Sequence, residues 1–121
     1  AAAVRARMQA NGLSEPAARL LVERGIEPVE GGFAWRSDPR LRLTSALRAD
    51  EGTVREWLAG VECPVRLIAA AQSPPYFGAE LRQARLACLR DGSAVVLPGG
   101  HHLHMETPAP VARELAAFLA G

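Results

Sequence analysis

The chain has 121 residues, about one domain's length, of which 49% are hydrophobic and 22% charged, and these values exclude an intrinsically disordered chain. Its 14 basic and 13 acidic residues nearly balance, so the charge shows no footprint of nucleic-acid or anionic-membrane binding. No apolar run reaches the roughly 18–20 residues of a membrane helix and no signal peptide is recognisable, so we expect a cytoplasmic protein that binds neither nucleic acid nor a membrane.

Three further features concern origin and compartment. Every basic residue is an arginine and alanine is abundant, a bias typical of GC-rich bacterial coding sequences. Cys63 and Cys88 form no CxxC pair, and two scattered cysteines indicate reduced, buried thiols. The opening stretch "AAAVRARMQANG" has no initiator methionine and resembles the end of a helix. We therefore expect the chain to be a piece of something longer.

The first half of the chain predicts two helices separated by turns. Residues 14–24, "SEPAARLLVER", form the first helix, with Ser14 as the N-cap and Gly25 as the stop. Residues 30–43, with a glycine pair, two aromatics and a proline, predict a turn, a short extended piece and another turn. Residues 50–60 form the second helix, capped by its first residue, an aspartate.

The second half predicts an α/β arrangement. Residues 63–71 and 93–98 read as strands buried in a parallel sheet, separated by a helix at 78–90 and followed by a loop. A last helix begins after Thr107, which we expect to cap it. This order is typical of right-handed βαβ crossovers. Two strands alone make no stable doubly covered sheet. Either the chain oligomerises through its strands or, as we expect, the remaining strands lie in sequence that precedes the chain.

The loop after the second strand contains all three histidines, His101, His102 and His104. In open α/β sheets, ligands and catalytic groups gather outside the carboxyl ends of the strands. Gly99 and Gly100 allow a tight turn that projects the next side chain away from the sheet. From the residues alone, the three imidazoles could form a metal site, an acid–base site or a polar loop.

The same stretch carries a resemblance to a known family. "LPGGHHLHME" followed by "TPAPVARELAAFL" resembles the C-terminal signature of α/β-hydrolase-fold enzymes of the serine-hydrolase-like branch. His101 follows a glycine, Glu106 lies five positions on, and Pro108 opens the last helix. "VRLIAA" and "VVLPGGHH" have the family's strand–helix–strand spacing, and "GGFAWRSDPRLRL" is similar to the stretch that links the family's cap to its core.

The resemblance implies an α/β fold with a division of the chain and a mechanism. Residues 1–49 would be the end of a helical cap with its linker, and residues 50–121 the C-terminal part of the core sheet. The implied mechanism uses a nucleophile, a histidine and an acid, with His101 as general base and acid. His102 is the alternative base, because a one-residue shift of the loop would exchange the two; His104 would then pack or form hydrogen bonds.

Two departures from the family pattern affect the expected activity. No serine has the G-x-S-x-G context of a nucleophile elbow, so we expect the nucleophile in the missing N-terminal half of the protein. The family's acid would fall near Ser73, where no carboxylate occurs; Asp38 and Glu80 have no motif behind them. We expect hydrolysis of an ester-like bond in a small, largely apolar substrate, without cofactor or metal, and no activity from these residues alone.

Other interpretations stay open. A non-catalytic α/β module could bind a partner or a metal through residues 101–104, although no cysteine or carboxylate pair completes a zinc shell. Glu106 suits a role at the start of the last helix, where a carboxylate interacts well with the helix dipole. Phe33, Trp35 and Tyr76 could line a substrate pocket, but aromatics beside turns more often pack against their surroundings.

Overall fold

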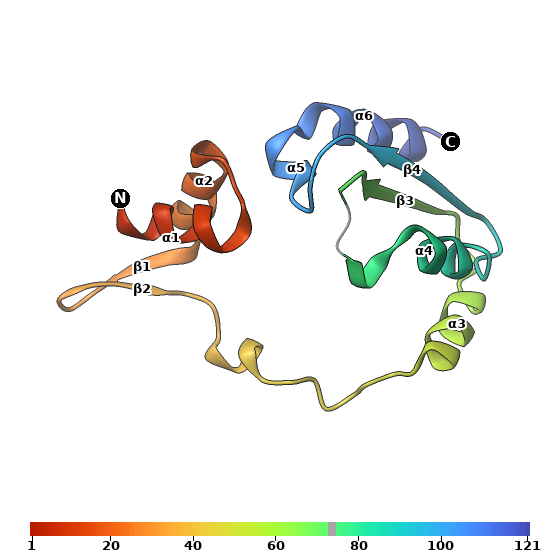
Figure 1. The fold of residues 1–121 in the computed structure, drawn as a ribbon, viewed down its shortest axis with the longest axis horizontal. Coiled ribbons are helices and arrows are strands. Elements are labelled where there is room, and N and C mark those ends of the chain that lie inside the picture. Colours follow the sequence, from red (N-terminus) through yellow and green to blue (C-terminus); the bar gives the residue numbers. More distant parts are fainter. Residues whose placement is uncertain (73–74) are drawn as a thin grey trace. The chain divides into compact units, whose positions relative to one another are not determined.

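The computed structural model describes residues 1–72 and 75–121, which form two compact units, residues 1–47 and 48–121. The first unit contains α1 (Ala2–Asn11), α2 (Glu15–Gly25), β1 (Ile26–Val29), β2 (Gly32–Trp35) and the short 3-10 helix η1 (Pro39–Arg42). The second contains α3 (Glu51–Ala59), β3 (Val65–Ala70), η2 (Pro75–Phe77), α4 (Ala79–Leu86), β4 (Gly92–Leu97), α5 (Leu103–Glu106) and α6 (Pro108–Leu119). Figure 1 labels the α-helices and the strands. Whether residues 1–49 belong to a cap stays a prediction.

The core of the first unit lies between α1 and α2. Five apolar residues are buried in this unit: Val4, Leu13, Ala17, Ala18 and Val22. Ser14 occupies the N-cap position of α2 with an extended backbone, and a proline stands in the first turn, as predicted. The helix continues through Gly25, one residue beyond the predicted end, and Ile26 begins a strand at once.

The first unit also holds a β-hairpin that the sequence analysis recognised only in part. The extended piece predicted within residues 30–43 is β2, but its partner β1 was missed. β1 pairs with β2 in antiparallel register, with Ile26 opposite Trp35 and Pro28 opposite Phe33. A proline lacks the N–H that a central strand needs, and in a two-stranded ladder it is tolerated. The strand β1 was therefore not predicted, because Pro28 is atypical of a strand.

Trp35 is held within the first unit, whereas Phe33 is not. The Arg7 guanidinium lies 4.2 Å from the centroid of a Trp35 ring, within range of a cation–π interaction. A Cβ atom on Gly25 would lie only 3.1 Å from the same indole, so glycine allows the close approach. Trp35 remains 40% exposed and Phe33 is 71% exposed, so the expectation that these aromatics pack against their surroundings is met in part by Trp35 and not by Phe33 within this unit.

The second unit is built on a parallel pair of strands. β3 and β4 run in register from the pair Val65–Gly92 to the pair Ala70–Leu97, and α4 makes the crossover between them. The predicted βαβ order and parallel pairing are confirmed. The mixed α/β arrangement that the sequence indicated is thus the one observed.

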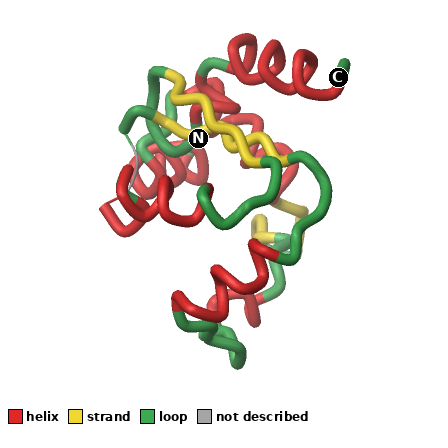
Figure 2. Tube along the Cα trace, turned by 90° about the vertical axis from the view of Figure 1, so that its right-hand side faces the viewer, coloured by secondary structure: helices red, strands yellow, loops and turns green. Residues whose placement is uncertain are grey.

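Helices lie on both faces of the β3–β4 pair. Val65 and Leu67 face a hollow that is also lined by α3 and α4, while Arg66, between them in the strand, pairs with Glu114 of α6. Because alternate side chains of a strand point to opposite faces, α6 lies on the face opposite α3 and α4. Figure 2 shows α6, which ends at the point marked C, beside the strand pair.

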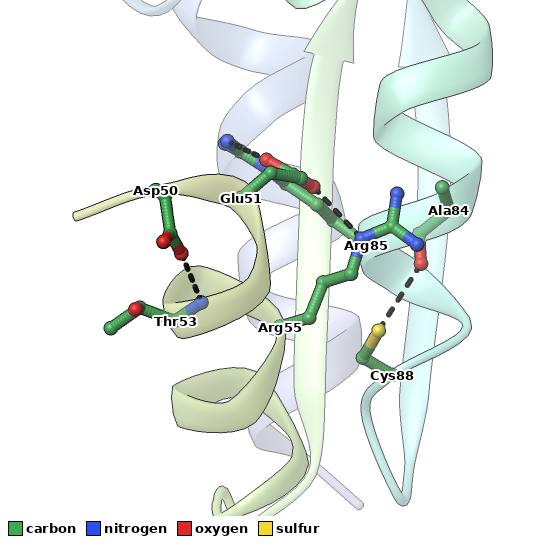
Figure 3. A network of polar contacts seen from close by, with 7 residues as sticks. All are labelled: Asp50, Glu51, Thr53, Arg55, Ala84, Arg85 and Cys88. Carbon is green, nitrogen blue, oxygen red and sulfur yellow. Dashed lines mark hydrogen bonds and ion pairs between the residues drawn. The ribbon is translucent and has the colours of Figure 1, made fainter.

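Charged side chains connect the two helices that share one face. Glu51 in the first turn of α3 pairs with Arg85 of α4 at 2.7 Å and with Arg55 of its own helix at 3.1 Å. Figure 3 shows the Glu51 carboxylate close to both guanidinium groups. The carboxylate of Asp50 accepts a hydrogen bond of 2.8 Å from the backbone N–H of Thr53, and this confirms the predicted cap of α3.

The strands are less buried than the sequence suggested. Ala69 and Ala70 at the end of β3 are buried. Along β4, by contrast, exposed residues alternate with half-buried ones, and Val96 is 51% exposed. The prediction of burial on both faces is therefore wrong for β4 in this structure, because a pair of strands leaves outer surface that further strands of a larger sheet would cover.

Two predicted helices differ from the structure at their ends. α4 stops at Leu86 and not at residue 90, because the N–H groups of Cys88 and Leu89 donate to carbonyls three residues back instead of four. Gly92 then packs so closely against Leu89 that a Cβ atom on the glycine would lie only 2.8 Å from the Leu89 Cβ. Thr107 does not cap α6 with its side chain: its hydroxyl donates to the Leu103 carbonyl at 3.2 Å. The helix still begins at the predicted proline.

The two cysteines lie in different environments. Cys63 and Cys88 are both free thiols. Cys63 is exposed, which makes the prediction of a buried thiol wrong for it, since it lies in the connection before β3. Cys88 is half-buried, and its thiol donates to the Ala84 carbonyl at 3.3 Å.

Among the helices of the described ranges, none combines the length and the apolar character required to cross a bilayer.

Candidate functional site

The histidine loop is fastened to the end of the sheet by backbone hydrogen bonds. Beyond the ladder, the Ala71 N–H donates to the Leu97 carbonyl at 2.8 Å, and the Gln72 N–H donates to the Gly99 carbonyl at 3.0 Å. Gly99 has a φ of 125°, a conformation that L side chains rarely adopt. The loop therefore leaves β4 in a fixed direction, at the carboxyl end of both strands.

The loop then winds into a helical turn where the sequence predicted only a loop. The Leu103 N–H donates to the Gly100 carbonyl at 3.0 Å, and the N–H groups of Met105 and Glu106 both donate to the His102 carbonyl. Leu103 is 6% exposed and anchors this turn, α5, against the rest of the unit. The imidazoles thus sit on a hydrogen-bonded scaffold.

The three histidines occupy different environments. His101 and His104 are exposed, while His102 between them is half-buried. The ring centroids of His101 and His102 are 4.9 Å apart in an edge-to-face arrangement, and those of His102 and His104 are 6.1 Å apart. Burial lowers the pKa of His102 below its ordinary value, and the nearby His101 and His104 lower it further, opposed in part by Glu106.

His101 opens onto an apolar cavity. The cavity has a volume of about 200 Å³. Besides His101 it is lined by residues from the end of β3 and by two side chains from the following turns, namely Leu67, Ile68, Ala69, Ala70, Phe77 and Leu103. An exposed imidazole beside apolar walls can exchange protons with a reacting group while the walls hold an apolar portion of the same molecule.

Among the described residues of the second unit, none of the other predicted candidates lines this cavity. Ser73, the position expected for the family's acid, lies outside the described residues. Asp38 belongs to the other unit, where its carboxylate accepts hydrogen bonds from the Arg40 side chain and backbone N–H, and both lower the pKa of Asp38. Glu80 is exposed in the first turn of α4. Tyr76 is 77% exposed, while its neighbour Phe77 lines the cavity.

Sequence reasoning missed Phe77 and Leu103 as parts of the site. Leu103 lies between two histidines in a segment predicted to be a loop, and a loop carries no periodicity that marks its buried side. Phe77 follows a pair of prolines in the sequence, a context that offers no spacing rule. The available signal was composition alone: each is an apolar residue beside a turn at the carboxyl end of a predicted strand.

The geometry also bears on metal binding. In the part of the chain that the structure describes, no group of three or more histidine, cysteine, aspartate and glutamate side chains is arranged to hold a metal ion. His101 and His102 meet edge to face, a contact between rings, whereas zinc ligands direct ring nitrogens toward a common point.

Comparison with known proteins gives two curated relatives. The chain is 28% identical over 118 residues to a serine hydrolase-like protein of Dictyostelium discoideum, covering 88% of this chain and 33% of the relative. It is 27% identical over 113 residues to a probable serine hydrolase of Drosophila melanogaster, covering 88% of this chain and 34% of the relative. The chain thus spans about a third of the length of these relatives. No family model matches it.

Solved structures share the fold. A hypothetical protein from Pseudomonas aeruginosa PAO1 superposes with a TM-score of 0.85 at 44% identity over 99% of this chain and 43% of that chain. A thioesterase domain from the curacin biosynthetic pathway superposes with a TM-score of 0.80 at 26% identity, over 96% of this chain and 42% of that chain. With its parallel β3–β4 pair, this chain is therefore part of an α/β-hydrolase-fold protein and corresponds to the C-terminal part of the fold.

Proposed function

We propose that the protein is a hydrolase that cleaves an ester or thioester bond of a small, largely apolar substrate through a nucleophile, a histidine and an acid, with His101 as the histidine. The observation that carries this proposal is the position of His101, exposed at the carboxyl end of β4 and bordering an apolar cavity of about 200 Å³. The hydrolase and thioesterase names of the similar proteins support the reaction class.

The proposed role of His101 is proton transfer in both directions. As the nucleophile attacks the substrate carbonyl, the imidazole takes the proton of the attacking hydroxyl and then delivers it to the leaving group. In the second half of the reaction it takes a proton from water, which attacks the acyl-enzyme, and returns that proton to the nucleophile. Leu103 and the end of β3 would contact the apolar part of the substrate.

The proposal leaves the nucleophile and the acid to the remainder of the protein. With an aspartate as nucleophile, His101 would instead activate the water that attacks the resulting ester. The 121 residues alone would then be inactive, and their essential partner would be the N-terminal part of the same protein. We also infer a cytoplasmic, bacterial protein, supported by two free thiols and by the arginine-only basic residues.

The test compares His101→Ala with His104→Ala in the full-length protein. Hydrolysis of p-nitrophenyl butyrate is the measurement, and His104 provides the matched control because it is an exposed histidine in the same loop. We expect His101→Ala to lower kcat by roughly 10³-fold, within the range of general acid–base catalysis. His104→Ala should retain kcat within about threefold, as a surface residue outside the reacting groups.

A second measurement identifies the nucleophile. A fluorophosphonate probe should label the full-length protein, and the label should disappear in His101→Ala. Hydrolysis without labelling would indicate an aspartate nucleophile with the same histidine. Equal activity of His101→Ala and the unaltered protein would refute the proposal, and stoichiometric zinc in the purified protein would favour a metal-binding module.

A further inference from the structure

His102 lies where it can control the orientation of the His101 ring. Its own ring meets the His101 ring edge to face, with centroids 4.9 Å apart, and lies 6.1 Å from the ring of His104. His102 is half-buried, while the two other histidines are exposed. His102 is also absent from the lining of the cavity that His101 borders.

The backbone of His102 is fixed independently of its ring. Its carbonyl accepts hydrogen bonds from the N–H groups of Met105 at 2.8 Å and of Glu106 at 3.1 Å. The next residue, Leu103, is buried. The His102 ring is therefore attached to a hydrogen-bonded turn and can act as a wall beside the His101 ring.

The lowered pKa of His102 favours a neutral ring beside His101. Burial lowers its pKa, and the charged groups that act on it are His101, His104 and Glu106, of which the two histidines lower the pKa further. A neutral ring beside His101 adds no positive charge that would oppose protonation of the catalytic imidazole during turnover. A protonated neighbour at this separation would oppose it.

We propose that His102 is a positioning residue that holds the His101 ring toward the apolar cavity through an edge-to-face contact. This inference rests on the proposed function, because it assigns His102 a role through His101. It also decides between the two adjacent histidines: His101 transfers the proton, and His102 sets the direction of its ring.

The role predicts which substitutions of His102 preserve activity. His102→Phe keeps a flat ring and cannot titrate, so kcat and the acid limb of the pH–rate profile should stay close to those of the unaltered full-length protein. His102→Ala removes the wall and should lower kcat about tenfold with KM changed less than twofold, since a misdirected base affects the chemical step. His102→Leu, which fills space without a flat ring, should fall between the two.

The experiment measures kcat, KM and their pH dependence with p-nitrophenyl butyrate, and thermal unfolding reports folding of each variant. Should His102→Ala fail to fold, His102→Leu supplies the same comparison with His102→Phe. Loss of activity in His102→Phe would overturn the inference, because it would make the titrating imidazole essential. Full activity in both His102→Ala and His102→Leu would overturn it as well.

The outcome is separable from failure of the proposed function. If His101→Ala retains activity, the proposed function fails whatever the His102 variants do. If His101→Ala is inactive while every His102 variant has unaltered kcat, the hydrolase proposal stands and only the positioning role is refuted. Because phenylalanine also fills space, the result that a merely space-filling role would not produce is a kcat of His102→Phe close to that of the unaltered protein together with a lower kcat of His102→Leu.

Discussion

The direction of the histidine loop depends on single residues, and Gly99 is the clearest of them. Its φ of 125° is a conformation essentially restricted to glycine, and a Cβ atom there would lie 3.4 Å from the Leu103 Cβ. The strain of a side chain at this position would be relieved by turning the loop, which carries His101 with it. Stability and activity are therefore linked at this residue.

We accordingly expect Gly99→Ala to destabilise the protein by about 1–3 kcal/mol and to lower kcat. Urea denaturation and ester hydrolysis measure the two effects. Gly78→Ala is the matched control, because Gly78 has no positive φ and its Cβ would meet nothing within 4 Å. Equal stability of the two variants would show that the loop accommodates a side chain at residue 99.

The sequence indicates the histidine loop as the candidate site, but it does not indicate how deeply each histidine is buried. The strand–glycine–histidine order pointed to His101, because it depends only on neighbouring residues. His102 remained an alternative, since burial decides its role and burial is a property of the folded unit. Phe77 was missed for the same reason: it lines the cavity through tertiary packing, which no spacing in the sequence indicates.

Between elements, one ion pair connects the sheet with the helix on its second face. The Arg66 guanidinium of β3 lies 2.9 Å from the Glu114 carboxylate of α6, and the two side chains are 29% and 27% exposed. The Arg66 Nε is buried and has no hydrogen-bond partner among the described residues. The pair is thus more shielded from water than a surface salt bridge, and the Glu114 carboxylate compensates much of the positive charge of Arg66.

Glu114→Gln should therefore destabilise the protein by about 1 kcal/mol, more than a surface pair and less than a fully buried one. The control is Glu62→Gln, an exposed residue in the connection before β3, with an expected change of less than about 0.5 kcal/mol. Chemical denaturation measures both. A Glu114→Gln variant as stable as the control would mean that the pair contributes nothing to attaching α6.

Prediction at this scale succeeded where the signal is local. Asp50 caps α3 through a residue three positions away, so the cap was readable from the sequence. β1 was missed because Pro28 breaks the pattern of a strand, and its pairing with Phe33 is a contact between two segments. Likewise the hydroxyl of Thr107 could have capped α6, and it donates instead to the carbonyl of Leu103.

At the scale of the molecule, the boundary between the units falls in a segment without regular structure. η1 ends at Arg42 and α3 begins at Glu51, and the units divide between Leu47 and Arg48. Leu47 is 70% exposed and Arg48 is exposed. A protease binds a stretch of backbone that has separated from the rest of the protein, and this segment makes few contacts that would have to break.

Limited trypsin digestion should therefore cleave the protein first after Arg42 and Arg48. Cleavage after Arg55 and Arg85 should be much slower, because both are helical and pair with Glu51. Mass spectrometry of the early products identifies the sites. Early cleavage within α3 or α4, before cleavage of the segment, would contradict the assignment of the boundary.

The βαβ order of the second unit was predictable because alternating helices and strands leave few topologies open. The exposure of β4 was not, since the sequence signals an apolar strand and cannot say how many neighbours cover it. Leu115 and Leu119 of α6 show the same difference: both follow the helical spacing of a buried face, but Leu115 is 47% and Leu119 80% exposed in this structure.

The parallel register of β3 and β4 also bears on the order in which the chain folds. The β1–β2 hairpin closes a turn of two residues, whereas joining Val65 to Gly92 requires the whole α4 crossover to be brought into place. Closing a longer loop costs more entropy before any contact repays it, so parallel pairs form late. The hairpin should thus be an early event in folding, and the bonds from Ala71 and Gln72 that fix the histidine loop should be among the last to form.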